Sequence, residues 1–530
     1  MRVAGTARFC LAAAPGVALC FVPERSLALA AAAFVVVAMP AWAVGRAIAA
    51  GDPDGDRIDF LAASFGGVAL SSLAVWTGAV LVGLSRTEVI VAPLVASLLL
   101  HLFTDASGET VRKSGAGRTG WILFVVAGCF ALLVALPFLP YGWERADGVH
   151  RMGLSDWYLH LMITSALDAA HSLPPRNPYL WADAGAHYHY GFHLVGAAIH
   201  RAAGRQGDVF PALLALTMLT AFAFPVVLFV VSRRTLDGDP RAALLAAAAG
   251  VFLFGFDLVV WVANALPDLV GAWPPSDGFA AIRAAVPSAH LDHWIEHDER
   301  QFNAPYTALL WAPHHVAAVV TALLAIHALR ARTRGSAIVV PVACLLASLP
   351  GLSGYVAITA AVGAAAVVVA DQVAGGRFFR RSTTVLRWGA VGVGALVLST
   401  PILASLRGSV GQHFAPLTVH LSSAGDWRNG AVFTTLFGHH SWTHLLDTPA
   451  LYLFEFGLVG ALGAAELVRR ARRREWTAVR RENAAILVAV FLFLNFVRPP
   501  LGGPNNLNFR PMLVVWSLLV PFAVEAWLRP

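Results

Sequence analysis

The sequence predicts an all-α fold: a polytopic transmembrane helical bundle of about 14 spans, whose extracytoplasmic loops carry short amphipathic helices. Three observations predict it. Of the 530 residues, 58% are hydrophobic and 13% are charged. The mean hydropathy is +0.66, and long apolar runs recur along the whole chain. Because soluble proteins carry about twice this share of charged residues, we expect an integral membrane protein.

Apolar runs that approach membrane-spanning length define the expected elements. A span needs about 20 mainly apolar residues. The expected spans cover about 9–23, 26–50, 60–84, 88–103, 119–140, 208–232, 240–263, 306–330, 336–349, 353–371, 388–405, 449–467, 483–497 and 510–528. The sequence does not decide whether 183–203 also crosses the membrane completely, so the expected count is 14 or 15.

Basic residues cluster in short loops between these runs and give the expected orientation. Such loops are typically cytoplasmic. They are 112–118, 233–234, 330–334, 377–387 and 469–481. The net charge of +7 is explained by these loops and does not indicate nucleic-acid binding. The opposite face then receives the loops 141–207, 264–305, 406–448 and 498–509, which hold nearly all the other histidines and acids.

Two aspartates on that face are candidate catalytic residues. Asp156 opens an amphipathic helix, and His160 follows one turn later, so both point to one side of the helix. A carboxylate there can act as a general base on an acceptor hydroxyl or hold a divalent cation. Alternatively, Asp156 caps the helix N-terminus. Asp147 competes for the catalytic role.

Three histidines form the pattern H-x-H-x3-H: His187, His189 and His193. His189 and His193 fall on one helical face, at a spacing compatible with metal binding. Alternatively, interfacial His and Tyr side chains, such as Tyr188, lie at the headgroup level without any ligand. The sequence therefore requires no cofactor, and a divalent cation, with His189 and His193 as candidate ligands, is an option.

Two further groups lie on the same polar face. His314 and His315 open a long apolar span near the aqueous boundary. Arg498 and Arg510 flank a run of asparagines that includes Asn506, just before the last span. Arginine makes forked, charge-assisted bonds to phosphate, so Arg510 can grip the phosphate of a lipid donor while the asparagines orient it. Snorkelling to ordinary headgroups is the alternative.

The arrangement resembles the GT-C superfamily of membrane-embedded glycosyltransferases, which use polyprenyl-phosphate-linked sugars. In that superfamily a span precedes a large extracytoplasmic loop with an acid near its start. The matching run here is the span 119–140, Asp156 with His160, Pro174-Pro175, Asn177-Pro178 and Tyr188-His189-Tyr190. The resemblance covers about 120–235. It departs from the superfamily in its lone acid, followed by Trp157, and in having no WWDYG-like motif.

The resemblance implies transfer of a sugar from a polyprenyl-phosphate donor to an extracytoplasmic acceptor during cell-envelope glycan assembly. It places the protein in the plasma (inner) membrane of a bacterium, with its active face extracytoplasmic. Asp156 would be the base. The implied substrate-binding residues are His160, Arg176, Tyr188, His189, His193, His314, His315, Arg498, Asn506 and Arg510. The implied partners are the lipid-linked sugar donor and membrane lipids, without nucleic acid; no partner subunit is indicated.

We expect three regions: a four-span N-terminal extension (1–118), a GT-C-like catalytic core (119–405) and the C-terminal spans (406–530). The main alternative function is a transporter or flippase of a lipid-linked or anionic substrate. It predicts mid-span charges and broken helices in symmetric halves. One broken run, 349–354, is present without a partner repeat. The sequence is also compatible with a polysaccharide polymerase or ligase, and with a non-catalytic assembly protein.

Overall fold

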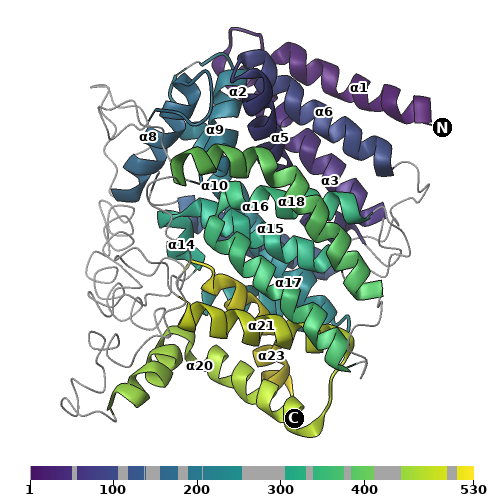
Figure 1. The fold of residues 1–530 in the computed structure, drawn as a ribbon, viewed down its shortest axis with the longest axis vertical. Helices are drawn as coiled ribbons and strands as arrows, with labels where there is room; N and C mark the ends of the chain where they lie inside the picture. Colours follow the sequence, from purple (N-terminus) through teal and green to yellow (C-terminus); the bar gives the residue numbers. More distant parts are fainter. Residues whose placement is uncertain are drawn as a thin grey trace.

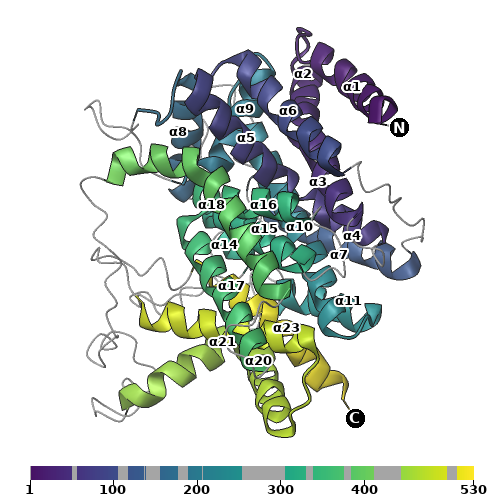
Figure 2. The ribbon, with the colours of Figure 1, turned by 45° about the vertical axis from the view of Figure 1, so that its right-hand side comes forward.

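Every regular element of the described chain is a helix, as the sequence predicts. The computed structural model describes residues 2–50, 56–104, 117–135, 138, 155–176, 189–205, 207–253, 305–329, 338–374, 383–410, 443–497 and 510–529. Most helices lie side by side across the bundle (Figures 1 and 2). One continuous hydrophobic core, running from Cys20 to Val524, joins them.

The described residues of the N-terminal half form a series of apolar helices. Its elements are α1 (Arg2–Leu19), α2 (Arg25–Ala33), the π-helical η1 (Phe34–Ala38), α3 (Met39–Ala50), α4 (Arg57–Ser64), α5 (Gly67–Val82), α6 (Arg86–Thr104), α7 (Gly117–Ala135), α8 (Ser155–Ala169), α9 (Gly191–Ala202), α10 (Phe210–Thr235) and α11 (Pro240–Phe252). Asp56 begins α4 with a capping box, in which its side chain and that of Asp59 each accept from the other's backbone N–H. Asp239 caps α11.

The C-terminal half continues the bundle. Its elements are α14 (Pro305–Trp311), α15 (Pro313–Leu329), α16 (Val339–Leu352), α17 (Gly354–Ala374), α18 (Thr383–Val410), α20 (Thr443–Arg473), α21 (Ala478–Phe496) and α23 (Met512–Leu528). Pro313 separates α14 from α15, because proline lacks the N–H that a continuous helix would need. Gly457 places a kink within α20.

Among the described residues, seven helical segments are long and apolar enough to cross a membrane, which indicates an integral membrane protein. They are Arg25–Ala49, Arg57–Val82, Arg86–Phe103, Gly117–Ala135, Phe210–Thr235, Gly354–Ala374 and Val385–Leu406. The other expected spans also contain helices, but these are shorter or carry more charge. The count of about 14 therefore stays a prediction.

Helix α9 bears on the undecided run 183–203. All of its 12 residues are buried. At 1.5 Å per residue it is about 18 Å long, which is too short to cross a bilayer core alone. The described part of this run is therefore a buried helix packed against α5, α8 and α10, whereas residues 183–188 lie outside the described residues.

The N-terminal helices pack directly on the middle of the chain. Trp76 of α5 stacks on Tyr190, with ring centroids 4.3 Å apart, and its indole N–H donates to Ser405 Oγ of α18 at 2.8 Å. Arg86 Nε donates to the Ala202 carbonyl at the end of α9 at 3.1 Å. These contacts make α5 and α6 part of the support for α9.

Basic residues near the C-terminus are paired with acids. Arg470 contacts both Glu466 and Glu525, and Arg529 donates to Glu466 at 2.8 and 2.9 Å. Arg480 also reaches Glu525, at 3.0 Å. This network ties α20, α21 and α23 together, so the arginines of this region hold helices to one another.

Candidate functional site

Five histidines from three parts of the chain meet inside the bundle. His160 comes from α8, His193 from the first turn of α9 and His189 from just before that helix, and His314 and His315 come from the first turn of α15. Four of them are buried and His189 is partly buried. We call these five residues the histidine cluster. Helices α8 and α14, which frame it, lie toward the left edge of the bundle in Figure 1.

The imidazoles of the histidine cluster are in mutual contact. His160 Nδ1 lies 3.0 Å from His193 Nε2, and the two rings are stacked with centroids 5.0 Å apart. The His314 ring lies 5.5 Å from that of His160 and 5.3 Å from that of His193. The ring centroids of His314 and His315 lie 3.9 Å apart. Such an assembly of ring nitrogens can bind an anion, a hydroxyl or a transition metal.

One face of α8 holds the cluster against α14. His160 Nε2 lies 2.7 Å from the Trp311 carbonyl, and Trp157 Nε1 donates to the Leu310 carbonyl at 2.7 Å. Both carbonyls belong to the last turn of α14, where a helix leaves acceptors without intrahelical partners. The break before Pro313 thus supplies the acceptors, and the spacing of Trp157 and His160 on α8 matches them.

The break between α16 and α17 supports the opposite side of the cluster. Ser353 stands between the two helices, and its Oγ lies 2.8 Å from His315 Nδ1. The same oxygen accepts from the Val356 N–H at 3.3 Å, as a helix cap does. A Cβ on Gly354 would lie 3.4 Å from His189, so the backbone passes directly beside that ring.

Arg510 brings a positive charge to the cluster from the far end of the chain. It directly precedes α23, and its Nε and Nη1 atoms are buried. Its charge acts on His160, His189 and His315. Burial, and to a smaller extent the Arg510 charge, together lower the pKa of His160 and of His189 to about 4, although the Trp311 carbonyl acts in the opposite direction on His160. These two imidazoles are therefore neutral near pH 7.

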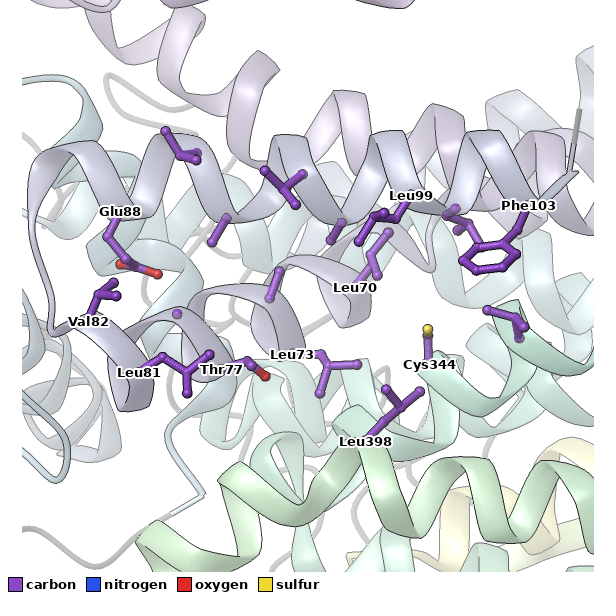
Figure 3. Close-up of a pocket in the computed structure, with 18 residues that line it drawn as sticks. Leu70, Leu73, Thr77, Leu81, Val82, Glu88, Leu99, Phe103, Cys344 and Leu398 are labelled. Atoms are coloured by element: carbon purple, nitrogen blue, oxygen red, sulfur yellow. The ribbon is translucent and has the colours of Figure 1, made fainter. Parts of the chain in front are cut away.

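An apolar cavity of about 630 Å³ lies between α5, α6, α16 and α18 (Figure 3). It runs along α6 from Glu88 to Phe103, and its walls are almost entirely hydrocarbon. Helix α5 carries one of these walls as well as Trp76, whose ring packs on Tyr190 next to His189. The Trp76–Tyr190 pair thus connects the cavity wall to the histidine cluster.

Glu88 is the exceptional residue of that cavity, and it was not among the residues singled out from the sequence. It is buried, and within the described residues neither carboxylate oxygen has a hydrogen-bond partner. Its carboxyl group lies on Gly78 of α5, where a Cβ would collide with it. A lone acid at the start of an apolar run is the only signal that could have identified it.

The structure brings together most of the substrate-binding candidates for which it describes side chains. His160, His189, His193, His314, His315 and Arg510 share one site. Arg176 lies exposed beyond the end of α8. Tyr188, Arg498 and Asn506 lie outside the described residues, as does the catalytic candidate Asp147.

Asp156 lies in the first turn of α8, whose first residue is Ser155. It is therefore one turn before His160 on the helix that frames the site, but its side chain lies outside the described residues. The other aspartate of α8, Asp168, lies at the opposite end and contacts Arg205 Nε at 3.2 Å and His200 Nδ1 at 3.4 Å. Asp168 thus joins α8 to α9.

Other residues of the site were not anticipated from the sequence. Ser353, Trp76 and the carbonyl groups of α14 all contribute to it. The broken run 349–354 is the signal that could have identified Ser353. Trp76 has none, because a tryptophan in an apolar run is ordinary in membrane helices.

Comparison with known proteins does not assign the chain to a family. Neither a protein-family model, nor a curated protein, nor a solved structure matches it. The function must therefore be argued from the site itself.

Proposed function

We propose that the protein is a membrane-embedded glycosyltransferase. It moves a sugar from a polyprenyl-phosphate donor to an extracytoplasmic acceptor during cell-envelope glycan assembly, in the plasma (inner) membrane of a bacterium. One observation carries the proposal. Two parts of the chain that are more than half its length apart border the histidine cluster. One is the first turn of α8, which holds Asp156, and the other is Arg510.

The proposed reaction is a direct displacement at the anomeric carbon of the donor. The acceptor oxygen forms a bond to that carbon while the bond from the carbon to the phosphate oxygen breaks. The Asp156 carboxylate takes the acceptor proton as a general base. The leaving polyprenyl phosphate keeps the electron pair, and Arg510 stabilises its charge by forked hydrogen bonds.

The apolar cavity offers a place for the donor's hydrocarbon chain. Its lining between Glu88 and Phe103 follows about 15 residues of α6, or roughly 22 Å of helix. Hydrocarbon binds to such a surface without losing any hydrogen bond. Helix α5 links this cavity to the histidine cluster, because it carries both a wall of the cavity and Trp76, whose ring packs on Tyr190 beside His189.

The test is sugar transfer by purified protein in lipid, with radiolabelled polyprenyl-phosphate sugars. Wild type should give a glycosylated product, and Asp156→Asn should not, while remaining inserted and monodisperse. Asp168→Asn is the matched control, because this aspartate of the same helix joins α8 to α9. The Asp168→Asn variant should be less stable than wild type but should still transfer the sugar. Transfer that persists in Asp156→Asn would remove Asp156 as the base, and no product from any such donor would contradict the proposal.

Arg510 tests the donor side of the same reaction. Arg510→Lys keeps a positive charge but loses the planar fork that matches phosphate. We expect it to raise the apparent KM for the lipid donor more than that for the acceptor. Equal effects on both substrates would contradict the assignment of Arg510 to the phosphate.

One observation favours transport of a lipid-linked or anionic substrate as the second candidate. The helix break at Ser353 lies against the site through His315, and transporters commonly build their substrate sites at discontinuous helices. Proteoliposomes that contain a fluorescent polyprenyl-phosphate sugar, together with an acceptor, separate the two functions. Movement of the intact lipid between leaflets supports transport, whereas sugar loss without movement supports transfer.

A further inference from the structure

The strongest unassigned feature is a group of three imidazoles within the histidine cluster. His160, His193 and His314 each offer one ring nitrogen, and these three atoms lie within 4.8 Å of one another. All three side chains are at most 1% exposed. They come from α8, α9 and α15, so only the tertiary fold assembles the group.

The hydrogen bonds of His160 fix which nitrogen faces the group. A carbonyl oxygen only accepts, so His160 Nε2 must carry the proton that it donates to Trp311, at 2.7 Å. In the neutral ring, Nδ1 then presents a lone pair toward His193 Nε2, 3.0 Å away. A histidine that ligates a metal is typically held in this way, by its second N–H on a backbone carbonyl.

We propose that His160, His193 and His314 bind one divalent transition-metal ion of the zinc class, with a further coordination position open to a ligand. Zinc–imidazole bonds of about 2.0–2.1 Å in a tetrahedral site place the nitrogens about 3.3 Å apart. The His160–His193 pair is already at 3.0 Å, and the nitrogen of His314 lies within 4.8 Å of both. A set of imidazole nitrogens suits zinc, cobalt or copper rather than magnesium or calcium, which prefer oxygen.

The group differs from the metal site expected from the sequence. The H-x-H-x3-H pattern assigns the ion to His189 and His193, which are neighbours in the chain. The geometry keeps His193 and replaces His189 with His160 and His314. His189 instead lies against Tyr355, at 5.3 Å between ring centroids, and near His315.

The neighbouring guanidinium identifies the class of the remaining ligand. Three neutral imidazoles contribute no negative charge to offset the two charges of the ion, and the positive charge of Arg510 also acts on His160. A phosphate anion bound by the metal and by Arg510 would offset this charge. This part deepens the proposed function, since the donor carries a phosphate; the metal site itself does not depend on sugar transfer.

Metal binding to the intact protein tests the proposal. The full chain, purified in detergent without a polyhistidine tag and stripped with a chelator, is titrated with Co²⁺. We expect one ion per chain and the visible absorption of a tetrahedral site with nitrogen ligands. Absence of a stoichiometric ion or of this spectrum in wild type would overturn the proposal, whether or not any variant folds. In that event the three rings form only a hydrogen-bonded network.

Matched variants locate the ion. His193→Asn and His314→Asn should each weaken Co²⁺ binding at least tenfold. The controls are His200→Asn and His327→Asn, which change another buried histidine on the same two helices. They should bind like wild type. Equal loss in targets and controls, with all four monodisperse, would place the ion elsewhere and overturn the assignment.

Inorganic phosphate tests the anionic ligand separately from catalysis. Phosphate should increase the Co²⁺ affinity of wild type several-fold. Arg510→Gln should bind Co²⁺ more tightly than wild type without phosphate, because a positive charge is removed, and should respond less to phosphate. A wild-type affinity that is unchanged by phosphate would refute the anion assignment. Failed sugar transfer with intact Co²⁺ binding would refute only the glycosyltransferase proposal.

Discussion

Gly191, the first residue of α9, provides the most direct test of how the site is assembled. A Cβ at this position would lie 2.8 Å from the Gly351 carbonyl oxygen and 2.9 Å from its carbon. Ordinary van der Waals contacts begin at 3.4 Å, so the Cβ added by the Gly191→Ala substitution would lie about 0.6 Å too close to the Gly351 carbonyl oxygen. Helix α9 must then move away from α16, because the Gly351 backbone cannot rotate aside.

The expected cost follows from overpacking. Inserting a methyl group into a well-packed core typically costs about 1–3 kcal/mol. Part of it is offset by the better helix propensity of alanine, at most about 1 kcal/mol. We therefore expect the midpoint of thermal unfolding in detergent to fall by several degrees. A shift of α9 also moves His193, so Co²⁺ affinity should fall together with stability.

Gly196, five residues further along α9, provides the control. A Cβ there would meet Thr164 Cγ2 at 3.5 Å, which is ordinary contact. Gly196→Ala should therefore unfold at the wild-type temperature or above it. If Gly191→Ala proves as stable as Gly196→Ala and binds Co²⁺ as wild type does, the close packing of α9 on α16 is refuted.

Two further predictions concern buried polar groups. Trp157→Phe removes the N–H donated to the Leu310 carbonyl and should destabilise the protein by about 1–3 kcal/mol, because a buried acceptor loses its donor. Arg233→Gln leaves the buried Asp59 without the guanidinium that contacts it at 2.7 Å. Loss of one partner from a buried pair costs about 3–5 kcal/mol; the lower end applies here, since His327 lies 3.5 Å from the same carboxylate. Reversible unfolding in mixed micelles measures both changes.

Exposed residues of the same types serve as controls. Trp121 is 73% exposed on α7, so Trp121→Phe should leave stability unchanged within about 0.5 kcal/mol. Arg57, next to the Asp56 cap, is also exposed. Arg57→Gln should likewise leave stability unchanged within about 0.5 kcal/mol. If either control cost as much as its buried counterpart, the loss would not come from the buried hydrogen bond or ion pair.

Much of the architecture could be predicted from the sequence, because helix formation in a membrane depends on local properties. Runs such as 26–50 and 208–232 are apolar over a full span, and a backbone in hydrocarbon must satisfy its hydrogen bonds internally. Both runs are helical. The helix break near 349–354 could also be predicted, from its proline and glycines. Whether the run 183–203 crosses the membrane could not be predicted, because length and hydropathy alone do not separate a short buried helix from a complete span.

Only part of the candidate site could be predicted from the sequence. Histidines and arginines on a predicted polar face could be collected as candidates, and spacing could pair His189 with His193. Spacing along one helix says nothing about residues on another. Whether His314 comes near His160, and whether the Arg510 charge acts on His160 and His315, depends on how α8, α15 and α23 pack.

The sequence by itself thus determined that this chain forms apolar helices and which polar side chains needed an explanation, since both follow from the cost of placing each residue in hydrocarbon. Only the tertiary structure decided which imidazoles face one another. That choice rests on contacts such as the Trp157 N–H on the Leu310 carbonyl and the Gly191 backbone against Gly351. Such contacts join residues more than 150 positions apart, and no local pattern encodes them.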